Sequence, residues 1–120
     1  MPEPTVVIRE CESGLARILL LFAAKERIPP AGYCHIEQEW GKYWFAVWVH
    51  EAYRHRGFGR KLLTLACAYA DMRNIKLSLT SKPHLVEWYE SAGFARAEPH
   101  PEGSVKMSDG QTYMERVPNQ

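Results

Sequence analysis

The sequence predicts a single α/β (α+β) domain in which one mixed β-sheet carries helices on both faces. The chain has 120 residues, which is the length of one ordinary domain and leaves little room for a second. Hydrophobic residues make up 46% of the chain, enough to bury a core. Extended and helical patterns follow one another in the order β-α-β-β-α-β-α-β-β. We therefore expect one domain over residues 1–120, without internal repeats.

The first two elements are a strand and a helix. Residues 5–10 (TVVIRE) are β-branched at their centre, which favours a strand. Residues 12–27 are expected to form a helix, because apolar residues recur there at three- and four-residue spacing and two prolines follow. The apolar positions are Leu15, Ile18, Leu19 and Phe22, and the prolines are Pro29 and Pro30.

A β-hairpin is predicted next, with its turn at Gly41 and Lys42. In its first strand (YCHIEQEW), the side chains of His35, Glu37 and Glu39 share one face, because side chains alternate along a strand. Its second strand (YWFAVWVH) is apolar on both faces, which predicts a central strand that is covered on both sides.

The second half of the chain continues with helix, strand, helix and strands. A helix is expected from the end of the stretch RHRGFGRK to about Arg73, with Asn74 as its C-terminal stop. Residues 75–81 (IKLSLTS) alternate like a strand, and Pro83 begins a helix that Gly93 ends. The remaining residues are expected to form two short strands around a loop, and QTYMERV is the clearer of the two.

Composition and charge exclude several classes of function. The formal net charge is +1, so the chain as a whole is not a binder of polyanions, and a nucleic-acid or membrane-surface role would need a local patch. Its three cysteines are widely spaced, which indicates reduced thiols and neither a metal site nor a disulfide framework. No apolar run reaches the length of a membrane span, and no signal peptide is recognisable. The sequence thus predicts a cytoplasmic protein with no metal and no membrane partner.

The stretch RHRGFGRK, residues 54–61, lies between a predicted strand and a predicted helix. Its glycines let a ligand approach the backbone, and the first N–H groups and the dipole of the helix attract anions. Neither a P-loop nor a dinucleotide-binding fingerprint is present, since GxxxxGK[ST] and GxGxxG are both missing. The stretch therefore predicts a phosphate site of another kind, and a solvated basic turn is the alternative interpretation.

Two segments resemble the GNAT superfamily of acyl-CoA-dependent N-acetyltransferases. The residues VWVHEAYRHRGFGRKLL resemble the family's central motif, [R/Q]-x-x-G-x-[G/A], which lies between the fourth strand and the following helix. The residues EWYESAGF, 87–94, resemble its second signature, on the helix after the fifth strand. Together the two segments cover residues 47–94, and QTYMERV suits the family's last strand.

This resemblance implies a site for acetyl-CoA between two splayed parallel strands of a mixed, mostly antiparallel sheet. Main-chain atoms of Val47, Trp48 and Val49 would pair with the pantetheine arm, and Tyr89 would protonate the leaving thiolate. The glycine turn would bind the pyrophosphate with its backbone amides, helped by its basic side chains. The turn residues are Arg54, His55, Arg56, Gly57, Phe58, Gly59 and Arg60.

Two single positions depart from the family pattern. Lys82 stands where the family often has an asparagine, although a lysine is still able to reach a CoA phosphate. Tyr43 stands where many members carry a glutamate that acts as general base. Other residues are candidates for that role, with a solvated surface position as the alternative for each one. They are Glu37 and Glu39, followed by the weaker candidates His35 and His50.

The N-terminal half is expected to be shorter than in the family, because two strands and one helix are predicted there instead of three strands and two helices. The acceptor site is then open or is completed by a second subunit of a homodimer. These features predict an N-acetyltransferase for a primary amine: a protein lysine, a protein N-terminus or a small cationic amine. One alternative is a catalytically trimmed module that binds CoA or a protein. A nucleic-acid binder is a third hypothesis, which the near-neutral net charge disfavours.

Overall fold

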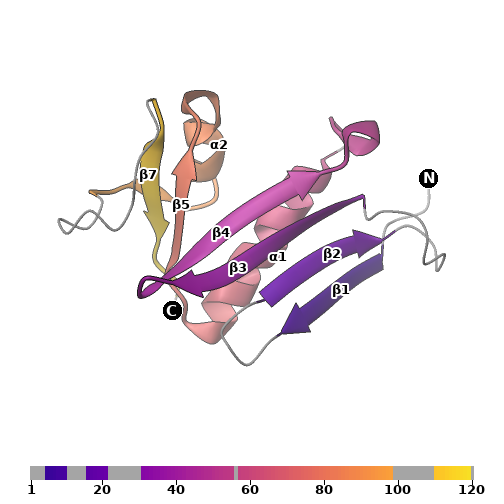
Figure 1. The fold of residues 1–120 in the computed structure, drawn as a ribbon, viewed down its shortest axis with the longest axis horizontal. Coiled ribbons are helices and arrows are strands. Elements are labelled where there is room, and N and C mark those ends of the chain that lie inside the picture. The colour runs from indigo at the N-terminus through magenta and orange to yellow at the C-terminus, as the bar shows by residue number, and fades with distance from the viewer. Residues whose placement is uncertain (1–4, 11–15, 22–30, 56, 99–109, 120) are drawn as a thin grey trace.

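A computed structural model describes residues 5–10, 16–21, 31–55, 57–98 and 110–119. These residues form a seven-stranded sheet in the order β1-β2-β3-β4-β5-β7-β6, with two α-helices (Figure 1). The strands are β1 (Thr5–Glu10), β2 (Ala16–Leu21), β3 (Gly32–Glu39), β4 (Lys42–Val49), β5 (Leu77–Ser81), β6 (Ala95–Arg96) and β7 (Thr112–Arg116). The helices are α1 (Phe58–Arg73) and α2 (Val86–Glu90), each preceded by a 3-10 turn, η1 (Glu51–Tyr53) and η2 (Pro83–Leu85).

The sheet is antiparallel except for one pair of strands. β4 and β5 are parallel, and their ladder contains only the pairs Tyr43 with Leu77 and Trp44 with Ser78. Beyond these pairs the two strands separate, as Figure 1 shows. The predicted fold class, a mostly antiparallel mixed sheet with one splayed parallel pair, is thereby confirmed.

The helix predicted for residues 12–27 is wrong where the structure describes it. Residues 16–21 form strand β2, which pairs with β1 and β3, so that Ile18 lies between Ile8 and Cys34. The segment ARILLL is apolar at consecutive positions and therefore fits a helix and a buried strand equally well. The segment is a strand because it pairs with β1 on one side and with β3 on the other. Four strands, β1 to β4, thus precede the glycine turn where the sequence predicted three, and the rest of the predicted helix lies outside the described residues.

The hairpin between β3 and β4 differs from its prediction by one residue in the turn. Glu39 pairs with Lys42, so the two turn residues are Trp40 and Gly41, and Lys42 belongs to β4. Both turn residues have positive φ, 52° and 72°. Two positive φ values are typical of the type I′ turn, whose twist matches that of the flanking strands.

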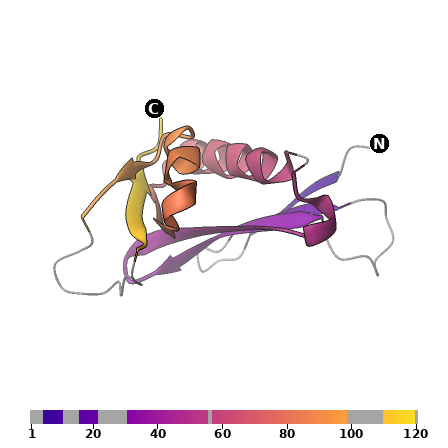
Figure 2. The ribbon, with the colours of Figure 1, turned by 90° about the horizontal axis from the view of Figure 1, so that it is seen from above.

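Both described helices lie over the same face of the sheet, whereas the sequence predicted helices on both faces (Figure 2). On β4 the ring of Phe45 is buried and contacts the rings of Tyr89 and Phe94, whereas Ala46 and Trp48 are exposed on the opposite face. The described part of the chain therefore covers one face of β4, and not the two faces that its apolar sequence predicted. None of the described helices is long and apolar enough to span a membrane.

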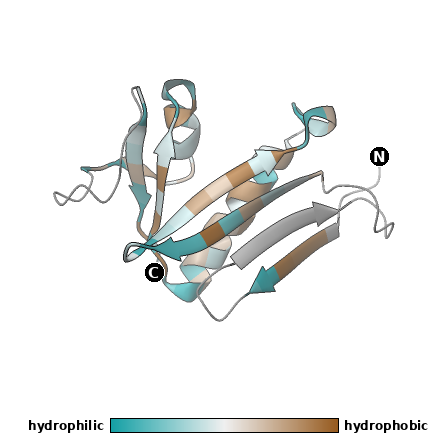
Figure 3. Ribbon diagram, in the orientation of Figure 1, coloured by the Kyte–Doolittle hydropathy of each residue, from teal (hydrophilic) through white to brown (hydrophobic). Residues whose placement is uncertain are grey.

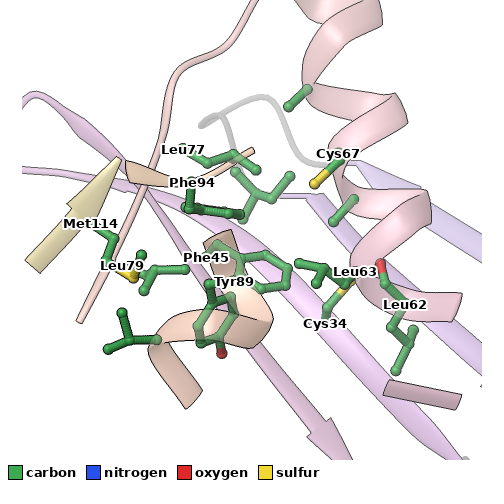
Figure 4. Close-up of a cluster of buried hydrophobic side chains, with 14 of the residues drawn as sticks. Cys34, Phe45, Leu62, Leu63, Cys67, Leu77, Leu79, Tyr89, Phe94 and Met114 are labelled. Carbon is green, nitrogen blue, oxygen red and sulfur yellow. Dashed lines mark hydrogen bonds between the residues drawn. The ribbon is translucent and has the colours of Figure 1, made fainter. Parts of the chain in front are cut away.

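The hydrophobic core lies between this face of the sheet and the helices. Apolar residues recur along β3 and β4 where these strands cross α1 (Figure 3). The core also includes side chains from β5, β7 and α2, which meet those of α1 in one cluster (Figure 4). Its main members are Cys34, Ile36, Phe45, Leu62, Leu63, Ala66, Leu77, Leu79, Val86, Tyr89, Phe94 and Met114.

An ion pair joins the C-terminal end of α1 to the last strand. Arg116 of β7 is only 5% exposed, and its Nη1 and Nη2 donate to Oδ1 and Oδ2 of Asp71 at 2.8 and 3.1 Å. Its Nε donates to the carbonyl oxygen of Ala92 at 2.9 Å. One guanidinium group thus links β7, α1 and the segment that follows α2.

Candidate active site

The separation of β4 from β5 leaves main-chain groups of β4 without a strand partner on the β5 side. The His50 N–H donates to the Ala31 carbonyl, and the β3–β4 register continues without a bulge from there. Because main-chain groups alternate in direction along an antiparallel strand, those of Trp48 face β3 and those of Val47 and Val49 face β5. Neither Val47 nor Val49 has a β5 partner in the described ladder.

A left-handed turn connects the end of β4 and η1 to helix α1. His55 has φ 65° and Gly57 has φ 82°, while Arg56 lies outside the described residues. A Cβ atom at Gly57 would meet nothing within 4 Å. Glycine at this position is therefore explained by the backbone conformation, which other residues adopt only with strain, and not by lack of space.

The N-terminus of α1 is open. Gly57 is its N-cap and no side chain caps the helix. The Lys61 N–H donates to the Gly57 carbonyl at 3.0 Å, so the amides of Gly59 and Arg60 come before this first i to i−4 bond. The helix dipole adds partial positive charge at the same end, which makes the turn suitable for an anionic group.

Two of the basic side chains at this turn are held by the protein. Arg54 Nε donates to the Val49 carbonyl at 3.2 Å, and Arg60 Nη1 donates to Ser91 Oγ at 2.9 Å. Lys82 is exposed directly after β5, at the start of η2. Val47 and Val49 thus lie at the open edge of β4 and the described turn residues at the N-terminus of α1. The main-chain groups of Trp48 face β3, contrary to the prediction that they pair with a ligand, and Lys82 follows β5.

Tyr89 lies on α2, with its ring in the core. The residue is 8% exposed, and its ring is 5.0 Å from that of Trp88 and 5.6 Å from that of Phe94, centroid to centroid. Its hydroxyl points away from the other labelled core side chains (Figure 4). Burial raises the pKa of this phenol above its usual value.

The Tyr89 hydroxyl has no hydrogen-bond partner among the described residues. In the same residues, every fully buried side-chain nitrogen or oxygen has a partner. The hydroxyl is therefore accessible to solvent although the ring is buried. A buried phenol with a free, accessible proton is suited to donate that proton to a leaving group.

The proposed general bases lie on the opposite face of the sheet from Tyr89. Glu37 and Glu39 are exposed at the end of β3, where Glu37 pairs with Trp44 and Glu39 with Lys42. Glu37 is therefore one strand away from the point where β4 and β5 separate. His50 is at the other end of β4, and its Nδ1 accepts a hydrogen bond from the Ala52 N–H at 3.1 Å.

A polar cluster at the same point of the sheet was missed in the sequence. Tyr113 of β7 is 2% exposed, and its hydroxyl lies 2.9 Å from Lys42 Nζ, 2.7 Å from Glu115 Oε2 and 3.2 Å from Ser78 Oγ. Lys76 is 3.2 Å from the same Glu115 oxygen. The alternation of QTYMERV places Tyr113 and Glu115 on one face, but nothing in the sequence indicates their partners on β4 and β5.

Hydrogen bonding shifts the pKa values within this cluster. The hydrogen bond between Lys42 and Tyr113 is the main reason why the pKa of the Lys42 amine is raised. Burial alone would raise the pKa of the Glu115 carboxyl, but hydrogen bonds from Tyr113 and Lys76 and the nearby lysine charges lower it. We expect Lys42 and Glu115 to remain charged at neutral pH.

No metal site is evident in the described part of the chain, where no three His, Cys, Asp or Glu side chains are grouped to hold an ion. The open edge of β4, the glycine turn at a helix N-terminus and Tyr89 on α2 are features that the resemblance to acyl-CoA-dependent N-acetyltransferases led us to expect. The model of the acetyltransferase (GNAT) domain matches residues 14–96. The chain belongs to this family.

Solved structures show the same fold. Tetrahymena GCN5 is 20% identical with a TM-score of 0.62, over 90% of this chain and 71% of that one. An acyl-CoA N-acyltransferase from Pseudomonas aeruginosa is 18% identical with a TM-score of 0.66, over 86% and 68%. A putative N-acetyltransferase from Lactobacillus plantarum is 24% identical with a TM-score of 0.60, over 86% and 67%. No curated protein sequence matches this chain.

Proposed function

We propose that this protein is an N-acetyltransferase that moves an acetyl group from acetyl-CoA to a primary amine by direct attack. The observation that carries the proposal is that the open edge of β4 leads directly to the open N-terminus of α1. The main-chain groups of Val47 and Val49 face the gap between β4 and β5, and β4 leads from there through η1 to the open N-terminus of α1. An extended pantetheine arm paired with β4 would thus end with its pyrophosphate at the helix amides.

The protein would bind acetyl-CoA through residues on both sides of the glycine turn. The amides of the turn would hold the pyrophosphate, with charge from its arginines, and Lys82 would contact a phosphate. The Val47 and Val49 main chain would hold the pantetheine arm. An N–H of this strand would also donate to the oxyanion that forms when the amine attacks the thioester carbonyl.

Two proton transfers complete the proposed reaction. The attacking amine must lose a proton, and we assign its removal to Glu37 or Glu39, directly or through water. Formation of the C–N bond gives the tetrahedral oxyanion. Its collapse restores the carbonyl and breaks the C–S bond, and Tyr89 would donate its proton to the departing sulfur. The carboxylates would also favour a cationic acceptor, such as a protein lysine, a protein N-terminus or a small polyamine.

Two measurements test the proposal. Acetyl-CoA must raise the unfolding midpoint, because a ligand that binds only the native state stabilises it, by about 2.7 kcal/mol at 100 times the dissociation constant. Release of free CoA thiol must then depend on an added amine from a panel of lysine peptides, peptide N-termini and polyamines. Failure of acetyl-CoA to bind would remove the assignment of the cofactor.

The second candidate function is a catalytically trimmed module that only binds CoA or a protein. It is favoured by Tyr43, which stands on β4 where many family members have a glutamate base, and by the position of Glu37 and Glu39 across the sheet from Tyr89. Binding of acetyl-CoA without thiol release for any amine in the panel would support this candidate.

A further inference from the structure

A three-residue contact joins the N-terminus of α1 to α2. Arg60 is the third residue of α1, and its Nη1 donates to Ser91 Oγ at 2.9 Å, just after α2. The guanidinium carbon lies 5.4 Å from the centroid of the Trp88 ring, a cation–π distance. Ser91 Oγ in turn donates to the Trp88 carbonyl at 2.5 Å. We call Arg60, Trp88 and Ser91 the helix clamp.

The helix clamp lies beside the glycine turn and Tyr89 of the candidate site. A Cβ atom placed on Gly59 would lie 3.7 Å from Trp88 Cζ2 and 3.7 Å from Val49 Cγ2, so the indole and the end of β4 flank the same glycine. On its other side the Trp88 ring packs edge-on against Tyr89, with centroids 5.0 Å apart. The Trp88 indole therefore contacts the Tyr89 ring and lies close to Gly59 in the first turn of α1, and the end of β4 lies close to the same glycine.

α2 depends on such contacts for its position. It has five residues and no side-chain cap, and a helix of that length is not stable alone in water. The Tyr89 ring contacts the rings of Phe45 and Phe94, and these contacts hold α2 against the sheet. Within the described part of the chain, the helix clamp provides a polar link between the first turn of α1 and the C-terminal end of α2.

We propose that Arg60, Trp88 and Ser91 are positioning residues that couple occupation of the anion site at the N-terminus of α1 to the placement of Tyr89. This inference rests on the proposed function. It gives the Arg60 side chain a role other than that of a simple phosphate ligand. The guanidinium has five N–H donors, of which one is bound to Ser91, so a phosphate at the helix amides is able to engage the remaining donors without breaking the clamp.

Hydrogen exchange tests the coupling without depending on turnover. In the wild-type protein, acetyl-CoA should slow exchange of the amides at residues 59–61 and also of those at 88–91. In the Ser91→Ala and Arg60→Lys variants, the first group should still be protected and the second should lose its protection. Protection of 59–61 alone in the wild type would overturn the coupling and leave the proposed function intact. No protection anywhere would refute the proposed function instead.

Exchange in the absence of ligand gives a separate test of the clamp itself. Amides at 88–91 should exchange about fivefold faster in both variants than in the wild type, which corresponds to the loss of one cation–π contact or hydrogen bond. Equal exchange in all three proteins would show that the clamp does not hold α2, whatever the protein binds.

Steady-state kinetics separate positioning from attraction of charge. Arg60→Lys keeps the charge but loses the planar group stacked on Trp88, so kcat should fall on the order of fivefold while the KM for acetyl-CoA changes little. Lys61→Ala removes one charge from the same helix turn without touching the clamp. This variant should raise the KM for acetyl-CoA and leave kcat at the wild-type value. A change confined to KM in Arg60→Lys would overturn the proposal.

Discussion

Trp44 on β4 and Ser78 on β5 are the last pair of the parallel ladder between these strands. On the face of the sheet that neither described helix covers, the hydroxyl of Tyr113 lies 3.2 Å from Ser78 Oγ and its ring packs edge-on against Trp44, 6.1 Å between centroids. Lys42 reaches the same hydroxyl from β4. Side chains of three strands therefore meet where the gap for the proposed ligand begins, and they stabilise the sheet at that point.

Removal of this hydroxyl should destabilise the fold. Tyr113→Phe leaves Lys42 and Ser78 without their common partner, and we expect a loss of about 1–2 kcal/mol in the free energy of unfolding, measured in urea. Tyr43→Phe is the matched control, since no described residue is hydrogen-bonded to the Tyr43 hydroxyl, and it should cost under about 0.5 kcal/mol. Equal losses in both variants would contradict the role of the cluster.

The ion pair of Asp71 and Arg116 should make stability depend on pH. Hydrogen bonds from Arg116, and then from the Asn119 N–H, hold the pKa of the Asp71 carboxyl below its usual range. A lowered folded-state pKa stabilises the fold above the unfolded value, and this contribution is lost as the pH falls through the folded value. Asp71→Asn should therefore cost about 1–3 kcal/mol at pH 7 and distinctly less near pH 3.

Glu10→Gln is the control for that experiment. Glu10 also accepts two hydrogen bonds from one arginine, Arg73, but both side chains are about half exposed. Exposed pairs contribute little, so this variant should change stability by under about 0.5 kcal/mol at either pH. If Asp71→Asn had an equally small effect on stability, burial of Arg116 would not make its ion pair with Asp71 stronger than an exposed pair.

Gly57 should be required for binding through its backbone. Gly57→Ala places an L-residue at φ 82°, which should cost about 1 kcal/mol of stability and weaken acetyl-CoA binding by altering the turn. Gly41→Ala imposes the same strain at φ 72° in the hairpin turn, also without steric contact. Titration by thermal shift should show weaker binding for the first variant and wild-type binding for the second.

The phenol of Tyr89 should affect the chemical step. Tyr89→Phe should lower kcat on the order of 100-fold and leave the affinity for acetyl-CoA nearly unchanged. Because burial raises the pKa of Tyr89, wild-type kcat should stay high as the pH rises past the usual value for tyrosine, and should fall only above it. Tyr69→Phe on α1 is the control. Wild-type turnover by Tyr89→Phe would favour the trimmed module.

The two carboxylates on β3 should differ in their effect. Glu37 pairs with Trp44 at the start of the gap, and Glu39 is one pair further away, opposite Lys42. We expect Glu37→Gln to lower kcat/KM on the order of 100-fold at neutral pH and Glu39→Gln to lower it less. Higher pH should restore much of the loss, because the acceptor amine is then already neutral. Wild-type rates in both variants would place the base elsewhere.

Much of the fold could be predicted from local patterns. The glycine turn of RHRGFGRK at the start of a helix, the helix that ends at Asn74 and the alternation of QTYMERV each depend on neighbouring residues only, and the structure agrees with all three. The segment ARILLL could not be assigned in this way, because its apolar residues suit both periods and the choice was made by pairing with β1 and β3. The turn was predicted at Gly41 and Lys42 and not at Trp40 and Gly41, because a positive φ is unusual for tryptophan.

The sequence by itself determined the family, the glycine turn at a helix start and the candidates Tyr89, Glu37 and Glu39, because each of these belongs to a short contiguous pattern. The tertiary structure alone decided that Tyr89 and the two carboxylates lie on opposite faces of the sheet. It also decided that Arg60 contacts Ser91, 31 residues away, and that Lys42 contacts Tyr113, 71 residues away. Contacts of that range depend on how the strands pair and how the helices pack, and no local pattern records them.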